Sequence, residues 1–216
     1  MDIPGEIRIV CVGDSHTFGV GTGMSYTYPA QLERLLTLNN HEQKFSVINL
    51  GIPGASTKRQ AQELKSFFNK HEAKIIILLT GRNNDFELKE GQDASFFNSI
   101  KYRLENLRSF KFLKVIFDRI VRRNKQRDSQ DMLAYKERYV DYLSYQLEWI
   151  RKLCRDKGAK LILLSYYNTS DNVIKEFAHK YNIPYLDFTG DFQSLFKREG
   201  RSRYISPDAS HLNYLG

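Results

Sequence analysis

The sequence has few cysteines and none of the spacings that a metal site or a disulfide framework needs. Cys11 and Cys154 are the only two among 216 residues, and no histidine or cysteine stands at zinc-ligand spacing from either. A disulfide or metal site is therefore not expected, and the two cysteines do not argue for an oxidising compartment. Both are predicted to be small buried hydrophobic side chains.

Long apolar runs are also missing. No stretch approaches the ~20 residues of a membrane-spanning helix, and the first six residues lack the basic and apolar regions of a signal peptide. The chain is therefore expected to be soluble as it stands. It would be either a cytoplasmic protein or a protein from which an upstream anchor or signal segment has been removed. The run from Gly19 to Gly23 has neither the Lys-Ser/Thr ending of a phosphate loop nor dinucleotide-binding spacing, so it predicts neither site.

Acidic residues are scarce in one segment. The net charge of +8 arises between Lys101 and Arg127, where ten Lys and Arg residues outnumber two acidic ones, and the rest of the chain is neutral. Phe and Ile recur there at helical spacing, which predicts an amphipathic basic helix packed on the core. The alternative is a cap that meets an anionic surface, such as phospholipid headgroups or an acidic polysaccharide. Nucleic acid is not expected, because the basic residues are not interleaved with aromatics as in a known module.

The rest of the chain alternates between two kinds of segment. Continuous apolar runs predict buried strands, and apolar residues at 3.6-residue spacing predict helices. Strands are predicted at about 7–12, 45–50, 74–79, 159–165 and 184–188, and helices at about 29–38, 57–68, 94–107, 112–121, 132–157 and 173–181. In the helix at 29–38, Leu32, Leu35 and Leu36 are expected to form the apolar face. The alternation predicts an α/β doubly wound sheet in a single domain over 1–216, with a basic helical insertion at about 86–130.

A hydroxyl group follows directly on the first strand. The apolar run from Ile7 ends in Gly13, Asp14 and Ser15, residues that favour turns and helix starts. In open parallel sheets, ligands bind beyond the carboxyl ends of the strands, so Ser15 is placed like a functional residue. Taken alone, it could equally be a helix N-cap. Asp14 is expected to be a structural hydrogen-bonding residue beside it.

Asp208 and His211 lie three residues apart near the end of the sequence. At the start of a helical turn, this spacing puts both side chains on one face, so that the carboxylate can orient the imidazole. His211 would then accept the proton of Ser15 as a general base, while Asp208 fixes its tautomer and stabilises the imidazolium. The other four histidines have no such setting and are expected to be ordinary structural side chains: His16, His41, His71 and His179.

The turns after the second and third strands carry candidate oxyanion donors. Gly54 offers an unobstructed backbone N–H, and Asn83 offers a side-chain amide. With the backbone N–H of Ser15, they would place three donors around a developing oxyanion. Asn84 is the alternative to Asn83, since a shift of one residue would make it the donor.

Four blocks of the sequence carry a family resemblance. These blocks are Gly13-Asp14-Ser15-His16, Asn49 to Gly54, Gly81-Arg82-Asn83-Asn84 and Asp208-Ala209-Ser210-His211. In this order they resemble the motifs of the SGNH hydrolase family, also called GDSL-type esterases and lipases. The resemblance implies a flavodoxin-like three-layer α/β/α fold with about five parallel strands, and hydrolysis of carboxylic esters without a metal or organic cofactor. By motif, Ser15 would be the nucleophile and an oxyanion donor, Gly54 and Asn83 further donors, His211 the base and Asp208 its partner.

The first hypothesis is therefore a serine esterase that forms an acyl-serine intermediate. Its substrate would be a small-molecule, carbohydrate or lipid ester with an O-acyl group, in particular acetyl or another short chain. Two departures from the family pattern lead to an alternative. The third block usually reads Gly-x-Asn-Asp, whereas Asn83 is followed by Asn84 and then Asp85. Similar proteins also continue into a final helix, without which the turn that bears Asp208 and His211 would be less well supported. The alternative is a binding module for acylated carbohydrate or lipid that turns over weakly or not at all.

Overall fold

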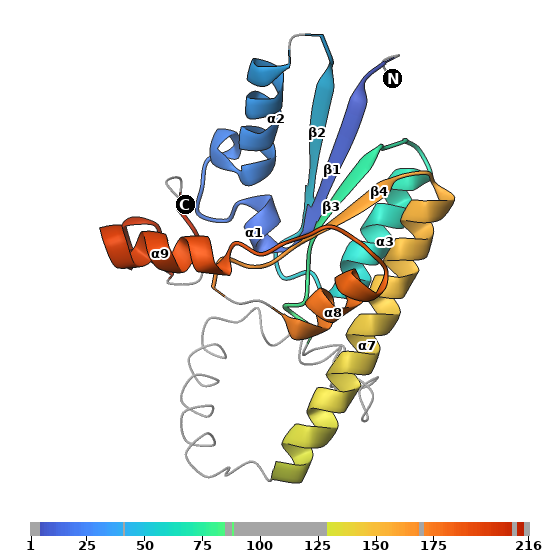
Figure 1. Cartoon of the computed structure of the whole chain (residues 1–216), viewed down its shortest axis with the longest axis vertical. Helices are drawn as coiled ribbons and strands as arrows, with labels where there is room; N and C mark the ends of the chain where they lie inside the picture. The colour runs from blue at the N-terminus through green and yellow to red at the C-terminus, as the bar shows by residue number, and fades with distance from the viewer. Residues whose placement is uncertain are drawn as a thin grey trace, which may run out of the picture. The chain divides into compact units, whose positions relative to one another are not determined.

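A parallel sheet of five strands forms the centre of the protein, in the order β2-β1-β3-β4-β5 (Figure 1). The structure, a computed structural model, describes residues 5–40, 42–84, 88, 129–168, 171–208 and 211–213. The strands are β1 (Ile7–Gly13), β2 (Phe45–Gly51), β3 (Ile75–Leu79), β4 (Lys160–Leu164) and β5 (Tyr185–Leu186). Four of them agree closely with the predicted strands, and β5 is shorter than the expected 184–188.

β1 lies in the interior of the sheet. Gly13 pairs with Gly51 of β2, and Val12 pairs with Leu78 of β3. With a strand on each side, the residues from Val10 to Val12 are fully buried, which explains the unbroken apolar run in the sequence. The chain passes from β1 to β2 on one side and then to β3 on the other. The topological switch point, where ligands bind in such sheets, is therefore at the carboxyl end of β1.

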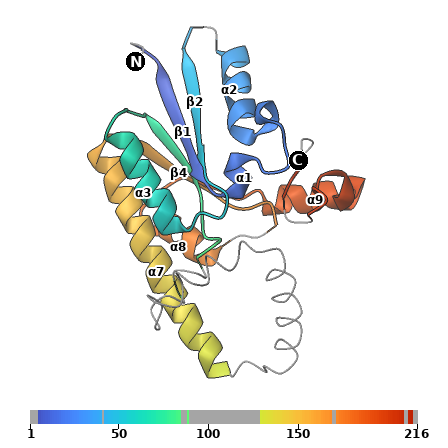
Figure 2. The ribbon, with the colours of Figure 1, turned by 180° about the vertical axis from the view of Figure 1, so that it is seen from behind.

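Helices cover both faces of the sheet (Figures 1 and 2). α2 (Tyr28–Asn39) lies on one face, whereas α3 (Thr57–Phe68), α8 (Asn172–Lys180) and the part of α7 (Ser129–Asp156) after Tyr142 lie on the other. Right-handed crossovers account for this arrangement, because connections that run in opposite directions along a sheet pass over opposite faces. The predicted α/β/α fold is confirmed.

The core is best developed on the face that carries α3 and α7. Along β3, Ile76 and Leu78 are fully buried, whereas the alternate residue Ile77 is half-buried. Burial of one such side chain contributes about 1.5–3 kcal/mol relative to exposure. The helices supply further fully buried side chains at helical spacing: Leu64, Leu143, Leu147 and Ile150.

The opposite face of the sheet is covered less completely. On α2, Leu35 and Leu38 are 54% and 62% exposed, so the expectation that Leu35 faces the core is wrong. The reason is that α2 packs mainly over β2, the edge strand, where only one narrow side of the helix meets the sheet. On β4, Leu164 is half-buried on this face.

Both cysteines lie in the core. Cys11 is in β1 and Cys154 is in α7, and each is buried and unpaired. Burial raises the pKa of each thiol to about 12, so neither forms a reactive thiolate near neutral pH. The predicted role of the two cysteines as buried hydrophobic residues is confirmed.

Two helices are not predicted by the hydrophobic pattern. α1 (Ser15–Phe18) is a single turn at the start of the expected loop, and α9 (Thr189–Glu199) follows β5 and has no fully buried residue. Short 3-10 turns lie at Met24–Tyr26 and Arg201–Arg203. The helices predicted at 94–107 and 112–121, and with them the basic segment from Lys101 to Arg127, lie outside the described residues.

The chain divides into two compact units. One consists of Met1–Asn84 with Tyr142–Gly216 and contains the whole sheet, and the other is Asp85–Asp141. A single domain with a basic helical insertion at about 86–130 stays a prediction. Among the described helices, none has both the length and the apolar character required to cross a membrane.

Candidate active site

Ser15 is the first residue of α1, directly beyond the carboxyl end of β1. Two glycines allow this helix to lie against the strand ends. A Cβ on Gly13 would be 2.0 Å from Thr17 Oγ1, and one on Gly51 would be 2.1 Å from the Phe18 nitrogen. No other residue fits at either position, so the two glycines fix where the hydroxyl of Ser15 emerges.

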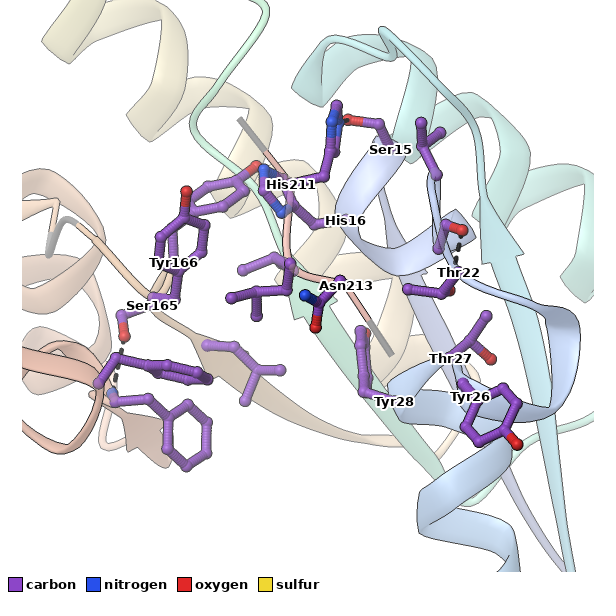
Figure 3. Close-up of a pocket in the computed structure, with 18 of the residues that line it drawn as sticks. Ser15, His16, Thr22, Tyr26, Thr27, Tyr28, Ser165, Tyr166, His211 and Asn213 are labelled. Carbon is purple, nitrogen blue, oxygen red and sulfur yellow. Dashed lines mark hydrogen bonds between the residues drawn. The ribbon is translucent and has the colours of Figure 1, made fainter. Parts of the chain in front are cut away.

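Three side chains predicted to act together are brought together. The Ser15 hydroxyl donates to His211 Nε2 over 2.7 Å (Figure 3). His211 Nδ1 lies 2.5 Å from Asp208 Oδ2. The carboxylate can only accept, so the His211 proton is assigned to Nδ1, and Nε2 is left as the acceptor for the serine proton. This is the arrangement in which a base activates a hydroxyl nucleophile.

Asp208 and His211 are expected at the start of a helical turn, and this stays a prediction because residues 209 and 210 lie outside the described part of the chain. Asp208 lies in a turn, and its Oδ1 accepts the backbone N–H of His211 over 3.1 Å. This local side-chain bond joins the two residues. On either side, Ile205 and Leu212 form an antiparallel bridge, and the Ser206 N–H donates to the His211 carbonyl over 2.8 Å.

The two candidate asparagines have different surroundings. Asn84 is buried, and its Oδ1 accepts from the N–H and the hydroxyl of Thr57 over 2.9 and 3.1 Å. Its amide thus fastens the start of α3. Asn83 is exposed, has a left-handed backbone with φ of 59°, and donates from Nδ2 to Asp14 Oδ2 over 3.0 Å. Because a carboxylate accepts only, this bond orients the Asn83 amide with its nitrogen toward Asp14 and leaves its second N–H for another acceptor.

These contacts predict opposite results for the two asparagines. Asn83→Gly, which tolerates the positive φ, is expected to lower kcat for ester hydrolysis on the order of 10²–10³-fold, the usual effect of removing one oxyanion donor. Asn84→Ala is expected to lower the free energy of unfolding by about 1–3 kcal/mol, since it leaves the buried Thr57 N–H without its acceptor, and to change kcat much less. Steady-state kinetics and thermal unfolding of both variants check this. The reverse pattern would make Asn84 the donor.

Gly54 lies in the turn after β2, with φ of 74° and open space around its Cα. The carboxyl ends of β1, β2 and β3 are adjacent in the sheet. Ser15, Gly54 and Asn83, which follow these three strands, therefore occupy the same edge of the sheet. The role of Gly54 as an oxyanion donor stays a prediction.

Asp14 connects several residues of the site. It is 1% exposed and caps α1 by accepting the His16 N–H at Oδ1 over 2.9 Å. Its Oδ2 accepts from Asn83 and from the Tyr166 hydroxyl, the latter over 2.9 Å. Burial, together with this neighbouring carboxylate, raises the pKa of Tyr166 well above its usual range, so the phenol remains a donor. A buried carboxylate with three donors is well stabilised, as the sequence indicated for Asp14.

A cavity of about 470 Å³ opens beside Ser15 and His211 (Figure 3). Its walls are mainly apolar and aromatic and come from both halves of the sheet unit, among them Tyr28, Leu32, Ile77, Leu164 and Phe192. Gly54 and Asn83 do not line it. The cavity therefore adjoins the nucleophile and the base but not these two candidate oxyanion donors. Among the described residues, no group of three or more His, Cys, Asp or Glu could hold a metal ion.

The sequence from residue 11 to 216 matches the GDSL-like lipase/acylhydrolase family. The chain belongs to this family. It is accordingly a carboxylic ester hydrolase, and the family resemblance found in its four sequence blocks is confirmed. No curated protein sequence matches the chain significantly.

Several solved structures share the GDSL-like fold of this chain. AlinE4, an SGNH-hydrolase family esterase, is 17% identical with a TM-score of 0.56 over 96% of this chain and 86% of its own. TesA is 15% identical with a TM-score of 0.59 over 96% and 90%. CEX, a two-domain esterase active on acetylated mannans, is 16% identical with a TM-score of 0.62 over 98% of this chain and 45% of its own. At these identities the likeness concerns the fold alone.

The GDSL-like site also contains residues that the sequence did not predict. His16 was expected to be an ordinary structural histidine, but its ring lies 4.8 Å from the ring of His211, centroid to centroid. Tyr166 and Arg82 reach the site from the ends of β4 and β3. Of these residues, only Arg82 could have been linked to the site from the sequence, because it lies between Gly81 and Asn83 in the third sequence block. His41 lies outside the described residues, and His71 and His179 are exposed.

Proposed function

We propose that this protein hydrolyses carboxylic esters through an acyl-serine intermediate, with Ser15 as the nucleophile and His211 as the base. The observation that carries the proposal is the continuous line of hydrogen bonds from Asp208 through His211 to the Ser15 hydroxyl, over 2.5 and 2.7 Å. In the first step, Ser15 Oγ forms a bond to the carbonyl carbon as its proton passes to His211 Nε2, and the carbonyl electron pair moves to the oxygen.

His211 carries a positive charge at this stage, and Asp208 stabilises it. The proton on Nε2 then passes to the oxygen of the leaving alcohol as the ester bond breaks, which leaves the acyl group on Ser15. A water molecule repeats the sequence, with His211 again as the base. The acid is released, and the Ser15 hydroxyl is restored.

The oxyanion formed in each step needs donors on the side opposite the base. The backbone N–H groups of Ser15 and Gly54 and the second N–H of Asn83 are proposed to supply them. The Asn83 proposal rests on the bond to Asp14, which fixes the amide orientation before the substrate binds. Donors that are already oriented need no rearrangement during the reaction, and this gives them their effect on the rate.

The position of the cavity supports a small acyl group on a larger alcohol. It adjoins His211, which returns a proton to the leaving alcohol, but neither Gly54 nor Asn83. We infer that the cavity receives the alcohol portion, while the acyl group, acetyl or another short chain, remains near the oxyanion donors. Several aromatic rings line the cavity, which suits an apolar alcohol or the flat face of a sugar ring. The mannan-active esterase CEX, with the same fold, makes acetylated carbohydrates a natural first class to assay.

Two series of esters test this assignment. In the first, p-nitrophenol is kept and the acyl group is acetyl, butyryl or octanoyl; in the second, the acetyl group is kept and the alcohol is methanol, 1-naphthol or a manno-oligosaccharide. We expect kcat/KM to fall with acyl length and to rise with the size of the alcohol. A preference for octanoate over acetate would contradict the short-chain assignment without affecting the roles of Ser15 and His211.

A further inference from the structure

A second histidine ring packs against the ring of the base. His16 follows Ser15 in the chain, and its ring is tilted 39° to that of His211 at 4.8 Å. The ring also lies 5.2 Å from the ring of Tyr166 and 5.8 Å from that of Tyr167, centroid to centroid. Figure 3 shows His16 beside His211 at one end of the cavity. Two adjacent imidazoles raise the question of which one takes up a proton.

The position of Arg82 indicates which of the two imidazoles takes up the proton. Its Nη1 lies 3.2 Å from His16 Nε2, and since a guanidinium only donates, Nε2 must accept and the His16 proton must be on Nδ1. Arg82 is itself held in place, because its guanidinium lies 4.2 Å from the centre of the Tyr166 ring and donates to the Asn168 side chain. Protonation of His16 at Nε2 would replace a hydrogen bond with the repulsion of two cations.

The surroundings of His16 also favour its uncharged form. Burial is the largest influence and, with the positive charges of Arg82 and His211, lowers the pKa of His16 to about 4. The carboxylates of Asp14 and Asp208 oppose this shift without reversing it. Tyr166 and Tyr167, whose rings also pack against the His16 ring, are aromatic.

We propose that Arg82 and His16 form a positioning pair for the base: Arg82 occupies His16 Nε2, so that an uncharged ring packs against His211 and only His211 accepts the Ser15 proton. The inference rests on the proposed role of His211. The base becomes a cation in each chemical step, and a protonated ring in contact with it would oppose that charge. Because Arg82 uses the Nε2 lone pair, His16 cannot compete as a base for Ser15.

The titration of His16 can be observed directly by long-range ¹H–¹⁵N NMR of the imidazole nitrogens in the wild-type protein. We expect His16 to be neutral, with its proton on Nδ1, near neutral pH and to become half protonated only at about pH 4. Protonation above pH 6, or a proton on Nε2, overturns the proposal. This measurement does not depend on activity. The NMR result can therefore confirm or contradict the proposal for His16 even if Ser15 is not the nucleophile.

The pH dependence of kcat/KM gives the second test. In the wild-type enzyme, the acid limb should follow a single proton, with a slope close to 1. In Arg82→Met, His16 should gain a proton within the same range, so that the limb becomes steeper and its midpoint moves to higher pH. Arg151→Met is the matched control, because the Arg151 guanidinium also lies over a tyrosine ring, 4.4 Å from that of Tyr181, but belongs to α7.

A double variant separates this role from a purely structural one. His16→Leu removes the second imidazole, so Arg82→Met with His16→Leu should regain a slope close to 1. His16→Leu alone should lower kcat by roughly tenfold through poorer placement of the base, with KM changed less than twofold. An Arg82→Met profile that matches the wild type in slope and midpoint would overturn the proposal, as would a double variant whose acid limb stays steep.

Discussion

Ser15→Ala is expected to lower kcat for p-nitrophenyl acetate hydrolysis on the order of 10⁴-fold or more, because it removes the atom that forms the bond to the acyl group. Alanine suits the first turn of α1, and the Asp14 cap does not involve the Ser15 hydroxyl, so the fold should be retained. Steady-state kinetics, with thermal unfolding to confirm the fold, measure the effect.

The matched control is Ser25→Ala, because Ser25 is an exposed serine in the 3-10 turn Met24–Tyr26. It should retain wild-type kinetics. If Ser15→Ala kept more than a tenth of the activity with an intact fold, Ser15 would not be the nucleophile.

Asp208→Asn has the second largest expected effect, a loss of kcat of about 10⁴-fold. The change keeps the shape of the side chain, but an amide no longer requires the His211 proton to be on Nδ1. The imidazole can then present a protonated Nε2 to Ser15, which prevents it from accepting the serine proton. The charge that balances the imidazolium is lost as well.

Asp171→Asn serves as its control. Asp171 caps α8 by accepting the Val173 N–H over 2.9 Å, and an asparagine side chain can make the same cap. It should therefore leave kcat and the unfolding temperature nearly unchanged. A loss of less than tenfold in Asp208→Asn would show that Asp208 does not orient the base.

Local sequence patterns were sufficient to predict the fold. The apolar run from Ile9 to Val12 is uninterrupted because this part of β1 is buried on both faces, and the Gly, Ser and Asn residues that follow the first three strands mark the edge of the sheet where the site lies. The spacing of Asp208 and His211 predicted their contact correctly. A second bond, from the His211 N–H to Asp208 Oδ1, also joins the two residues.

The residues around the proposed triad could not be predicted in the same way. Tyr166 meets Asp14 across 152 positions of the chain, and Arg82 meets His16 across 66, so no local pattern records either contact. His16 was misjudged because its setting is created by other segments of the chain. Leu35 was misjudged for a related reason: periodicity shows that a helix has an apolar face, but not that its sheet ends beneath it.

The anionic-surface hypothesis for the segment from Lys101 to Arg127 stays a prediction, since these residues lie outside the described part of the chain. The alternative hypothesis, an inert binding module for acylated carbohydrate or lipid, differs from the esterase in one property. An inert module has no activated serine, whereas an esterase with His211 hydrogen-bonded to Ser15 does.

Reaction with a fluorophosphonate, followed by intact mass and peptide mapping, tests the nucleophile most directly. The wild-type protein should gain the mass of one phosphonyl group, located on the peptide that contains Ser15, and the Ser15→Ala variant should gain none. Absence of labelling in the folded wild-type protein, or labelling that persists in Ser15→Ala, would contradict the assignment of Ser15 as the activated nucleophile.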